Sequence, residues 1–296
     1  QAAIDAGAKL YDDRTPGKRR ADALMELIQH ATDQLPQPAR GSITGSSKAV
    51  VILDLATLQA HADPPDILLT NFSHYVSLFA EWHNVPVVGT DRPMPCATAD
   101  NITIINFGMG SPNAATVMDL LSAIEPSATL FLGKCGGLKK RNTIGDLILP
   151  IAAIRGEGTS NDYFPAEVPA LPAFALQKAI STTIREHQVD YWTGTVYTTN
   201  RRVWEHDDKF KEYLKSIRAM AIDMETATIF IAGFKNEIPS GALLLVSDQP
   251  MISSGVKTDK SDKKVTQKFV DKHIKIGIDS LNQLINNKQT VKHLKF

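Results

Sequence analysis

Cysteine is scarce in this sequence, neither sign of charge is in excess, and no long apolar run is present. Two cysteines in 296 residues, Cys96 and Cys135, are too few for a disulfide framework, so we expect reduced thiols in a cytoplasmic protein. The 32 Lys and Arg residues balance 32 Asp and Glu residues, which argues against nucleic acid or an anionic membrane as a partner. The longest apolar runs, such as residues 49–53 and 242–246, fall far short of the roughly 18 residues that span a bilayer.

The length and composition are those of a globular protein. Apolar residues make up 43% and charged residues 22%, which excludes disordered, collagen-like and coiled-coil chains. A chain of 296 residues is about twice the usual domain length of roughly 150, so one large domain or two smaller ones are expected.

The first 66 residues differ in texture from the rest. Residues 18–30 have the spacing of a short amphipathic helix, prolines and glycines break the chain over residues 36–45, and Pro64 and Pro65 stiffen a linker. We therefore divide the chain into an N-terminal segment of uncertain fold, residues 1–66, and a second unit, residues 67–296.

From residue 67 onward, strand and helix patterns alternate. The patterns predict strands at residues 102–107, 128–132, 146–154, 191–197, 219–223 and 242–246, and helices at 112–124, 173–185, 225–232 and 262–285. This alternation predicts an α/β fold with a mostly parallel or mixed sheet. Ligands of such folds bind beyond the carboxyl ends of the strands, so the residues that follow each strand are the candidates for a site.

Two glycines, Gly108 and Gly110, follow the strand at 102–107 and precede a helix. A helix N-terminus favours an anion, but a dinucleotide-binding fingerprint needs a third glycine where Asn113 stands. NAD is therefore not expected. The turn either serves packing or faces a ligand.

Cations follow two of the strands. Lys134 lies close to the end of the strand at 128–132, and Arg201 and Arg202 stand beside Trp204. Paired arginines next to an aromatic ring suit a phosphate and a stacked base, with surface salt bridges as the alternative. Cys135 has no histidine near it in sequence, so we interpret it as a structural thiol.

Carboxylates end two further strands, as the pairs Met224-Glu225 and Ser247-Asp248. Two carboxyl groups at one ligand crevice are typical of enzymes that cleave glycosidic bonds, in which one of the two acts as the general acid. Either carboxylate is alternatively a helix cap.

Taken in order, several segments resemble the signatures of the nucleoside phosphorylase/nucleosidase superfamily: Gly108–Ala115, Gly133–Leu138, Asp223–Ala227 and Val246–Asp248. Within this superfamily, residues 67–296 resemble the short bacterial type of AMP nucleosidase, through the stretches 158–163, 198–206 and 248–251. The resemblance covers about three quarters of the chain. It implies an α/β three-layer sandwich around a twisted mixed sheet, without metal or cofactor, that cleaves an N-glycosidic bond.

The resemblance also implies roles for the four strand-end residues. Met224 lies under the ribose and Glu225 accepts hydrogen bonds from its 2′ and 3′ hydroxyls, while Asp248, paired with Ser247, donates a proton to purine N7. General acid help of this kind is worth about 10²–10⁴-fold in rate. Asp248 must then stay protonated near neutral pH, which desolvation beside the apolar residues 243–246 favours.

Two departures from the phosphorylases favour hydrolysis. The early Gly-Asp-Pro-x-Arg element of the phosphorylases is replaced by residues 69–75, which contain no arginine, and a second arginine position is Phe131. Without these guanidinium groups a phosphate co-substrate is held poorly, so water is the expected acceptor and AMP gives adenine and ribose 5-phosphate. The alternatives are a purine nucleoside phosphorylase, another nucleosidase, or a catalytically silent nucleotide-binding module.

The substrate's own 5′-phosphate still needs cations. The candidates are Arg201, Arg202, Arg92 and Lys134. The resemblance implies a homo-oligomer, dimer-based and up to a hexamer, in which Arg92 acts from a neighbouring subunit. Asn71 and Tyr163 are candidate contacts to water or to the base.

The N-terminal segment departs from that resemblance. Residues 13–24 resemble an actinobacterial repeat family found upstream of HNH nuclease domains, and we extend this interpretation to residues 1–63. No HNH motif follows, so a fusion at the linker is the hypothesis for this segment.

Overall fold

The computed structural model describes residues 65–252, 255 and 259–286. The N-terminal segment, with the resemblance predicted for residues 1–63, lies outside the described residues apart from its last two positions.

The described residues form eight strands, six α-helices and one short 3₁₀ helix. The strands are β1 (Asp66–Thr70), β2 (Cys96–Ala99), β3 (Ile102–Asn106), β4 (Thr129–Gly137), β5 (Leu147–Gly156), β6 (Tyr191–Thr199), β7 (Ala221–Asp223) and β8 (Ser240–Asp248). The helices are α4 (Ser73–His83), α5 (Ser111–Leu121), η1 (Thr159–Asp162), α6 (Phe174–Glu186), α7 (Asp208–Ser216), α8 (Thr226–Lys235) and α9 (Asp259–Asn286).

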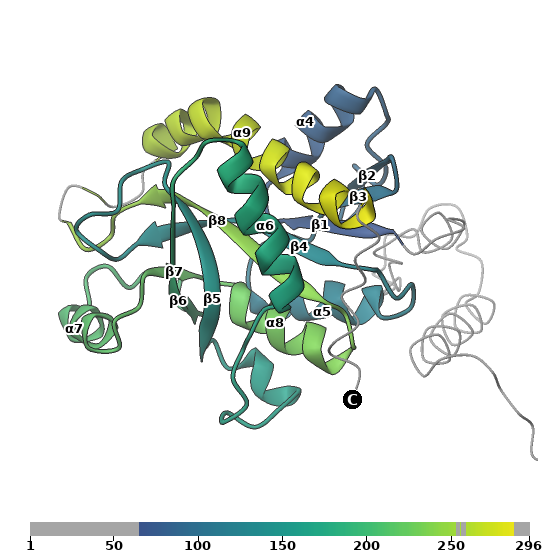
Figure 1. Cartoon of the computed structure of the whole chain (residues 1–296). Coiled ribbons are helices and arrows are strands. Elements are labelled where there is room, and N and C mark those ends of the chain that lie inside the picture. Colours follow the sequence, from purple (N-terminus) through teal and green to yellow (C-terminus); the bar gives the residue numbers. More distant parts are fainter. Residues whose placement is uncertain (1–64, 253–254, 256–258, 287–296) are drawn as a thin grey trace, which may run out of the picture.

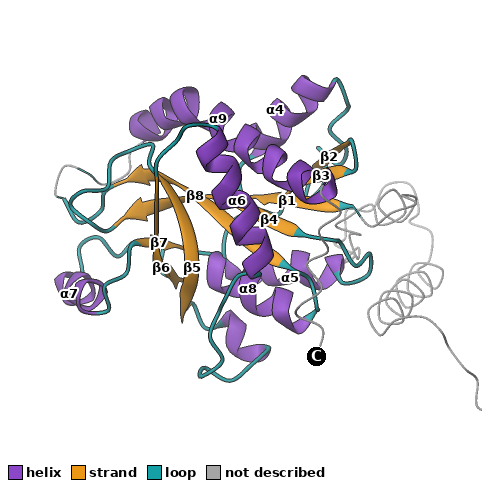
Figure 2. Ribbon diagram, viewed as in Figure 1, coloured by secondary structure: helices purple, strands orange, loops and turns teal. Residues whose placement is uncertain are grey.

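Helices cover both faces of one mixed sheet, so the molecule has three layers (Figures 1 and 2). One buried cluster joins α5 and α8 to the sheet, and a second joins α4, α6 and α9 to the opposite face. The predicted α/β three-layer sandwich is confirmed. Long helix α9 also confirms its predicted apolar face, because Val265, Ile274, Ile278 and Leu281 are all buried.

Strand β4 is the branch point of the sheet. It pairs in parallel with β1 on one side and with β8 on the other, and its last residues pair with β7. Strands β8, β5, β6 and β7 pair in that order, so they close a ring that returns to β4. This ring gathers the ends of β4, β6, β7 and β8 around one point.

The predicted strand at 128–132 is too short. Strand β4 continues through the glycine-rich stretch Gly133–Gly137, which the sequence pattern places in a loop. Glycines fit there because the neighbours are close: a Cβ on Gly136 would lie 2.9 Å from the Pro250 side chain, and one on Gly133 would overlap Phe131.

Two of the α-helices were not predicted from the sequence patterns. Helix α4 follows β1 directly, and α7 lies between β6 and β7, where the Asp207 carboxylate accepts the Phe210 N–H at 3.0 Å and caps the helix. None of the described helices combines the length and the apolar composition needed to cross a bilayer.

A buried histidine ties α9 to the sheet. His273 is 1% exposed; its Nε2 donates to the Leu243 carbonyl at 3.0 Å and its Nδ1 accepts from the Tyr75 hydroxyl at 2.9 Å. Both contacts suit the neutral ring, and burial lowers the pKa of His273 from 6.5 to about 4.

This histidine predicts a loss of stability in mild acid. The unfolded chain takes up a proton on His273 as the pH falls below 6.5, whereas the folded chain resists protonation until about pH 4. Between pH 7.5 and pH 4.5 the free energy of unfolding should therefore fall by about 2–3 kcal/mol more in the wild type than in His273→Gln. Urea unfolding of both proteins at the two pH values measures the difference.

Comparing the wild type with His273→Gln cancels the contributions of the other titrating groups to the pH dependence of stability, because both proteins contain them. Asp66, whose pKa burial raises to about 7, favours the fold at low pH and opposes it as the pH rises, but it is present in both proteins. Equal pH dependence in the two proteins would contradict the role of His273.

Candidate active site

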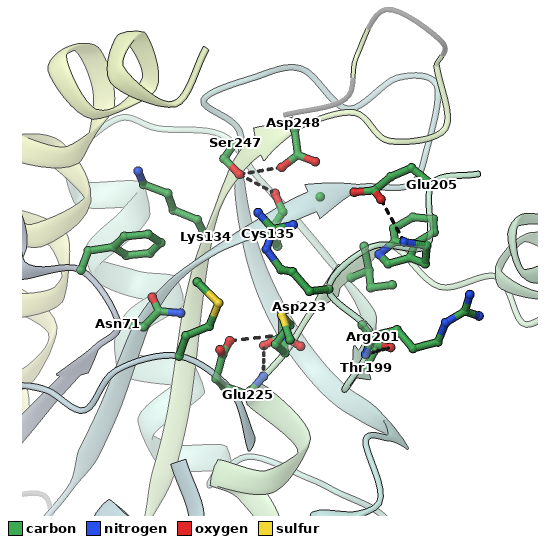
Figure 3. Close-up of a pocket in the computed structure, with 17 residues that line it drawn as sticks. Asn71, Lys134, Cys135, Thr199, Arg201, Glu205, Asp223, Glu225, Ser247 and Asp248 are labelled. Carbon is green, nitrogen blue, oxygen red and sulfur yellow. Dashed lines mark hydrogen bonds between the residues drawn. The ribbon is translucent and has the colours of Figure 1, made fainter. Parts of the chain in front are cut away.

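A cleft opens where the ring of strands converges (Figure 3). Its walls come from β4 and from the residues at or just after the ends of β1, β6, β7 and β8. This is the crevice at the carboxyl ends of strands in which α/β folds bind ligands.

The structure brings eight of the twelve predicted site residues to this cleft: Asn71, Lys134, Arg201, Arg202, Met224, Glu225, Ser247 and Asp248. The two acids face the cleft from different sides, Glu225 after β7 and Asp248 at the end of β8 (Figure 3). Gly108, Gly110, Arg92 and Tyr163 do not line it.

The glycine turn holds an acid rather than a ligand. The Gly110 N–H donates to Oε1 of Glu225 at 2.7 Å, and the Ser111 hydroxyl donates to the Met224 carbonyl at 2.6 Å. Gly110 has a φ of 93°, which a side chain disfavours. Between the two glycines only Met109 reaches the cleft. The turn therefore joins the start of α5 to the segment that carries Glu225.

Arg92 and Tyr163 lie elsewhere in this chain. Arg92 is exposed in the loop between α4 and β2, with its Nε 3.7 Å from the Asp91 carboxylate. The Tyr163 hydroxyl donates to Asp119 on α5 at 2.6 Å, so this ring fastens the η1 loop to the body of the protein. Tyr163 does not line the cleft, so within this chain it is not placed to contact water or a base there.

Glu225 is 2% exposed although it lines the cleft. Burial, followed by the nearby charge of Asp223, raises the pKa of Glu225 from 4.5 to about 8. The N–H groups of Gly110 and Met224 and the Asn71 side chain oppose the rise by hydrogen bonding to the carboxylate. Glu225 is thus a carboxyl group that changes charge near neutral pH.

Asp223 anchors this segment from beneath. Its carboxylate accepts the Thr198 hydroxyl at 2.7 Å, the Thr226 hydroxyl at 2.5 Å, and the N–H groups of Thr226 and Glu225 at 2.7 and 3.2 Å. These bonds tie β6 to the start of α8, and they favour the charged form of Asp223 against the desolvation that raises its pKa.

Asp248 ends the buried strand β8, as predicted. Its Oδ1 accepts the Ser247 hydroxyl at 2.7 Å, and the same hydroxyl reaches the Cys135 carbonyl at 3.4 Å. Ser247 therefore fixes one carboxylate oxygen of Asp248 against β4. Cys135 is 3% exposed, in keeping with its interpretation as a structural thiol.

The predicted cations differ in their surroundings. Arg201 forms an ion pair with Asp207 at 2.9 Å and lies over the Phe210 ring, and its guanidinium turns away from the two acids (Figure 3). The surface salt bridge is thus the correct alternative for Arg201. Lys134 is 8% exposed with its Nζ 4.4 Å from the centre of the Phe72 ring, and Arg202 is exposed at the rim.

Trp204, indicated in the sequence only as a ring beside Arg201 and Arg202, lines the cleft, together with residues that were not predicted: Phe72, Met109, Thr199, Glu205, Ile222 and Asp223. A signal existed for Asp223, which precedes the predicted pair Met224-Glu225, and for Trp204 and Glu205, which fall inside the matching stretch 198–206. The described residues contain no cluster of three or more His, Cys, Asp or Glu side chains able to hold a metal ion.

Comparison with known proteins gives consistent similarities. The chain is 29% identical to AMP nucleosidase from Escherichia coli K12, over 95% of this chain and 67% of that protein, so the similarity extends into residues 1–64. It is 25% identical to guanosine phosphorylase from Halorubrum lacusprofundi, over 62% of this chain and 77% of that protein.

Comparison with solved structures gives the same classes of protein. AMP nucleosidase from Bacteroides thetaiotaomicron is 56% identical to this chain and superposes with a TM-score of 0.69. The superposition covers 77% of this chain and 91% of that protein's chain. Purine nucleoside phosphorylase from Toxoplasma gondii, in complex with immucillin-H, is 18% identical with a TM-score of 0.66 and shares the fold.

The family model described as Phosphorylase superfamily matches residues 67–282. This span contains every strand of the ring and all residues that line the cleft. On this match, and on the fold and cleft just described, the chain belongs to the phosphorylase superfamily.

Proposed function

We propose that the protein hydrolyses AMP to adenine and ribose 5-phosphate. The proposal is supported by the 56% identity to one AMP nucleosidase and the 29% identity to another. The chemistry of the cleft agrees, because two carboxyl groups, Glu225 and Asp248, share it with the cations Lys134 and Arg202.

The observation that favours water over phosphate as the acceptor is that neither of the two arginine positions of the phosphorylases carries an arginine in this chain. Phe131 stands at one of them; it is fully buried and packs on Phe107 with ring centres 5.7 Å apart. The stretch 69–75 replaces the other with no arginine, and it contributes only the neutral Asn71 and Phe72 to the cleft. A phosphate co-substrate therefore loses two charged partners.

In the proposed reaction the bond between C1′ of the ribose and N9 of adenine breaks, and its electron pair moves onto the base. Asp248 delivers a proton to N7, so that adenine leaves as a neutral molecule. The oxygen of water bonds to C1′ and releases a proton, which balances the one donated by Asp248.

Glu225 and Met224 are proposed to hold the sugar. The ionised carboxylate of Glu225 accepts from the 2′ and 3′ hydroxyls, and its position is already set by the Gly110 and Met224 N–H groups. Fixing the ribose in this way lowers the entropy cost of reaching the transition state.

Lys134 and Arg202 are the proposed partners of the 5′-phosphate. Both line the cleft, whereas the Arg201 guanidinium pairs with Asp207. We keep Arg92 as a proposed contribution from a neighbouring subunit of a cytoplasmic homo-oligomer.

The decisive test of the function is product identification. The protein should release adenine and ribose 5-phosphate from AMP without added phosphate, and it should act far less well on adenosine, which lacks the 5′-phosphate. Chromatography of both substrates with and without inorganic phosphate measures this. Release of ribose 1-phosphate from adenosine only when phosphate is present would establish a purine nucleoside phosphorylase instead.

The acid role of Asp248 predicts the effect of Asp248→Asn. Since the amide cannot donate a proton to the leaving base, kcat should fall by about 10²–10⁴-fold while AMP binding is largely kept. Steady-state kinetics with calorimetric binding separates the two. Asp208→Asn, on a side chain that is 92% exposed on α7, is the matched control and should keep wild-type turnover. Turnover of Asp248→Asn near that of the wild type would remove Asp248 from the acid role.

The raised pKa of Glu225 predicts the pH dependence. Only the ionised group accepts from both ribose hydroxyls, and its pKa is raised from 4.5 to about 8. In the free enzyme, kcat/KM for AMP should therefore rise about ten-fold from pH 7 to pH 9. The rise should vanish in Glu225→Gln, whose amide has no charge to change. A rising limb that persists in this variant would assign the ionisation to another group.

A further inference from the structure

Glu205 is a second carboxylate on the Asp248 side of the cleft, and the proposed reaction does not use it. It lines the cleft and its carboxyl group turns inward, toward the side on which Asp248 lies (Figure 3). Glu225 lies across the cleft from both (Figure 3). Because Glu205 and Asp248 line one cleft, a ligand bound there can meet both carboxyl groups.

The segment that carries Glu205 is held firmly. Trp204 is 5% exposed and packs edge-on against Phe210, with ring centres 5.5 Å apart and an angle of 78°. The Trp204 carbonyl accepts the Asp207 N–H at 2.9 Å, which closes a turn around Glu205. The position of Glu205 is thus set by packing against α7.

One oxygen of the Glu205 carboxylate is already in use. Oε2 accepts the backbone N–H of Trp204 at 3.0 Å, which fixes the rotation of the group. Oε1 accepts no hydrogen bond, and Glu205 forms no ion pair, among the residues that the structure describes. An oriented acceptor therefore remains for a donor on a ligand.

The pattern of donors and acceptors on a purine indicates which ligand group could donate to Oε1 of Glu205. On one edge of adenine lie N7, an acceptor, and the 6-amino group, a donor; on the same edge of guanine and hypoxanthine lie N7 and O6, both acceptors. A base whose N7 meets Asp248 must point its C6 substituent along that side of the cleft. A carboxylate there accepts from an amino group and repels a carbonyl oxygen.

We propose that Glu205 is the specificity-determining residue that selects 6-aminopurines over 6-oxopurines, an inference that rests on the proposed function for the placement of N7 at Asp248. Glu205 accepts a hydrogen bond from the 6-amino group through Oε1. A 6-oxopurine leaves that oxygen unpaired and faces it with another acceptor, so IMP is the disfavoured substrate.

The test compares three nucleotides that differ only at C6: AMP, IMP and purine riboside 5′-monophosphate, which carries hydrogen there. The wild type should prefer AMP to IMP. In Glu205→Gln, whose amide can also donate to O6, the ratio of kcat/KM for AMP to that for IMP should fall by at least about ten-fold. Cleavage of the compound with hydrogen at C6 should change little. Glu212→Gln, an exposed glutamate on α7, is the control and should leave the ratio unaltered.

An unchanged AMP to IMP ratio in Glu205→Gln, or an equal loss on all three nucleotides, would overturn the proposal, the second outcome marking a positioning role. Calorimetric binding of free adenine and hypoxanthine to both proteins gives a readout that does not require hydrolysis. Adenine selectivity that is lost in Glu205→Gln upholds the inference even if AMP is not hydrolysed, in which case the proposed function alone falls. Equal affinities of the wild type for the two bases overturn the inference even if AMP is hydrolysed.

Discussion

The burial of two carboxyl groups within three residues, Asp223 and Glu225, is the constraint on which the cleft depends. Two like charges out of water repel each other, and each needs hydrogen bonds in place of solvent. Asp223 is satisfied by two threonine hydroxyls and two N–H groups, and Glu225 by the glycine turn ahead of α5. The pair thereby locks together β6, β7, α5 and α8, the elements that hold Glu225 at the cleft.

The curvature of the sheet explains why acids far apart in sequence meet. Because β4 pairs with three strands, the sheet closes on itself instead of spreading flat. A flat sheet in the same strand order would set the ends of β7 and β8 well apart. Small residues near the end of β4 permit the close approach, since side chains at Gly133 or Gly136 would overlap their neighbours.

Much of the buried sheet could be predicted from the sequence, although the fully buried strand β1 and the glycine-rich half of β4 could not. Apolar runs such as residues 242–246 indicate strands, and acids directly after buried strands, Glu225 and Asp248, reach the cleft because strand direction alone carries them there. For Arg201 the sequence leaves a phosphate and a surface salt bridge as alternatives, because the partner of a long side chain depends on proximity in space; in the structure this partner is Asp207. Helix α7 was not predicted, although Phe210, Tyr213, Leu214 and Ile217 recur at the i, i+3, i+4, i+7 spacing of an amphipathic helix.

The sequence pattern predicts too short a range for strand β4 for a related reason. Glycine is disfavoured in strands as an isolated preference, and only the tertiary contacts of Gly133–Gly137 override it. The raised pKa of Glu225 likewise depends on a neighbour, Asp223, and on burial that no linear pattern reports.

The aromatic cluster around α7 has a consequence of its own. Tyr197, Trp204 and Phe210 pack with Leu214 and Ile222 into a small core that is separate from the two large ones. The rim of the cleft between β6 and β7 therefore has apolar contacts of its own, which fix it against the ends of these two strands.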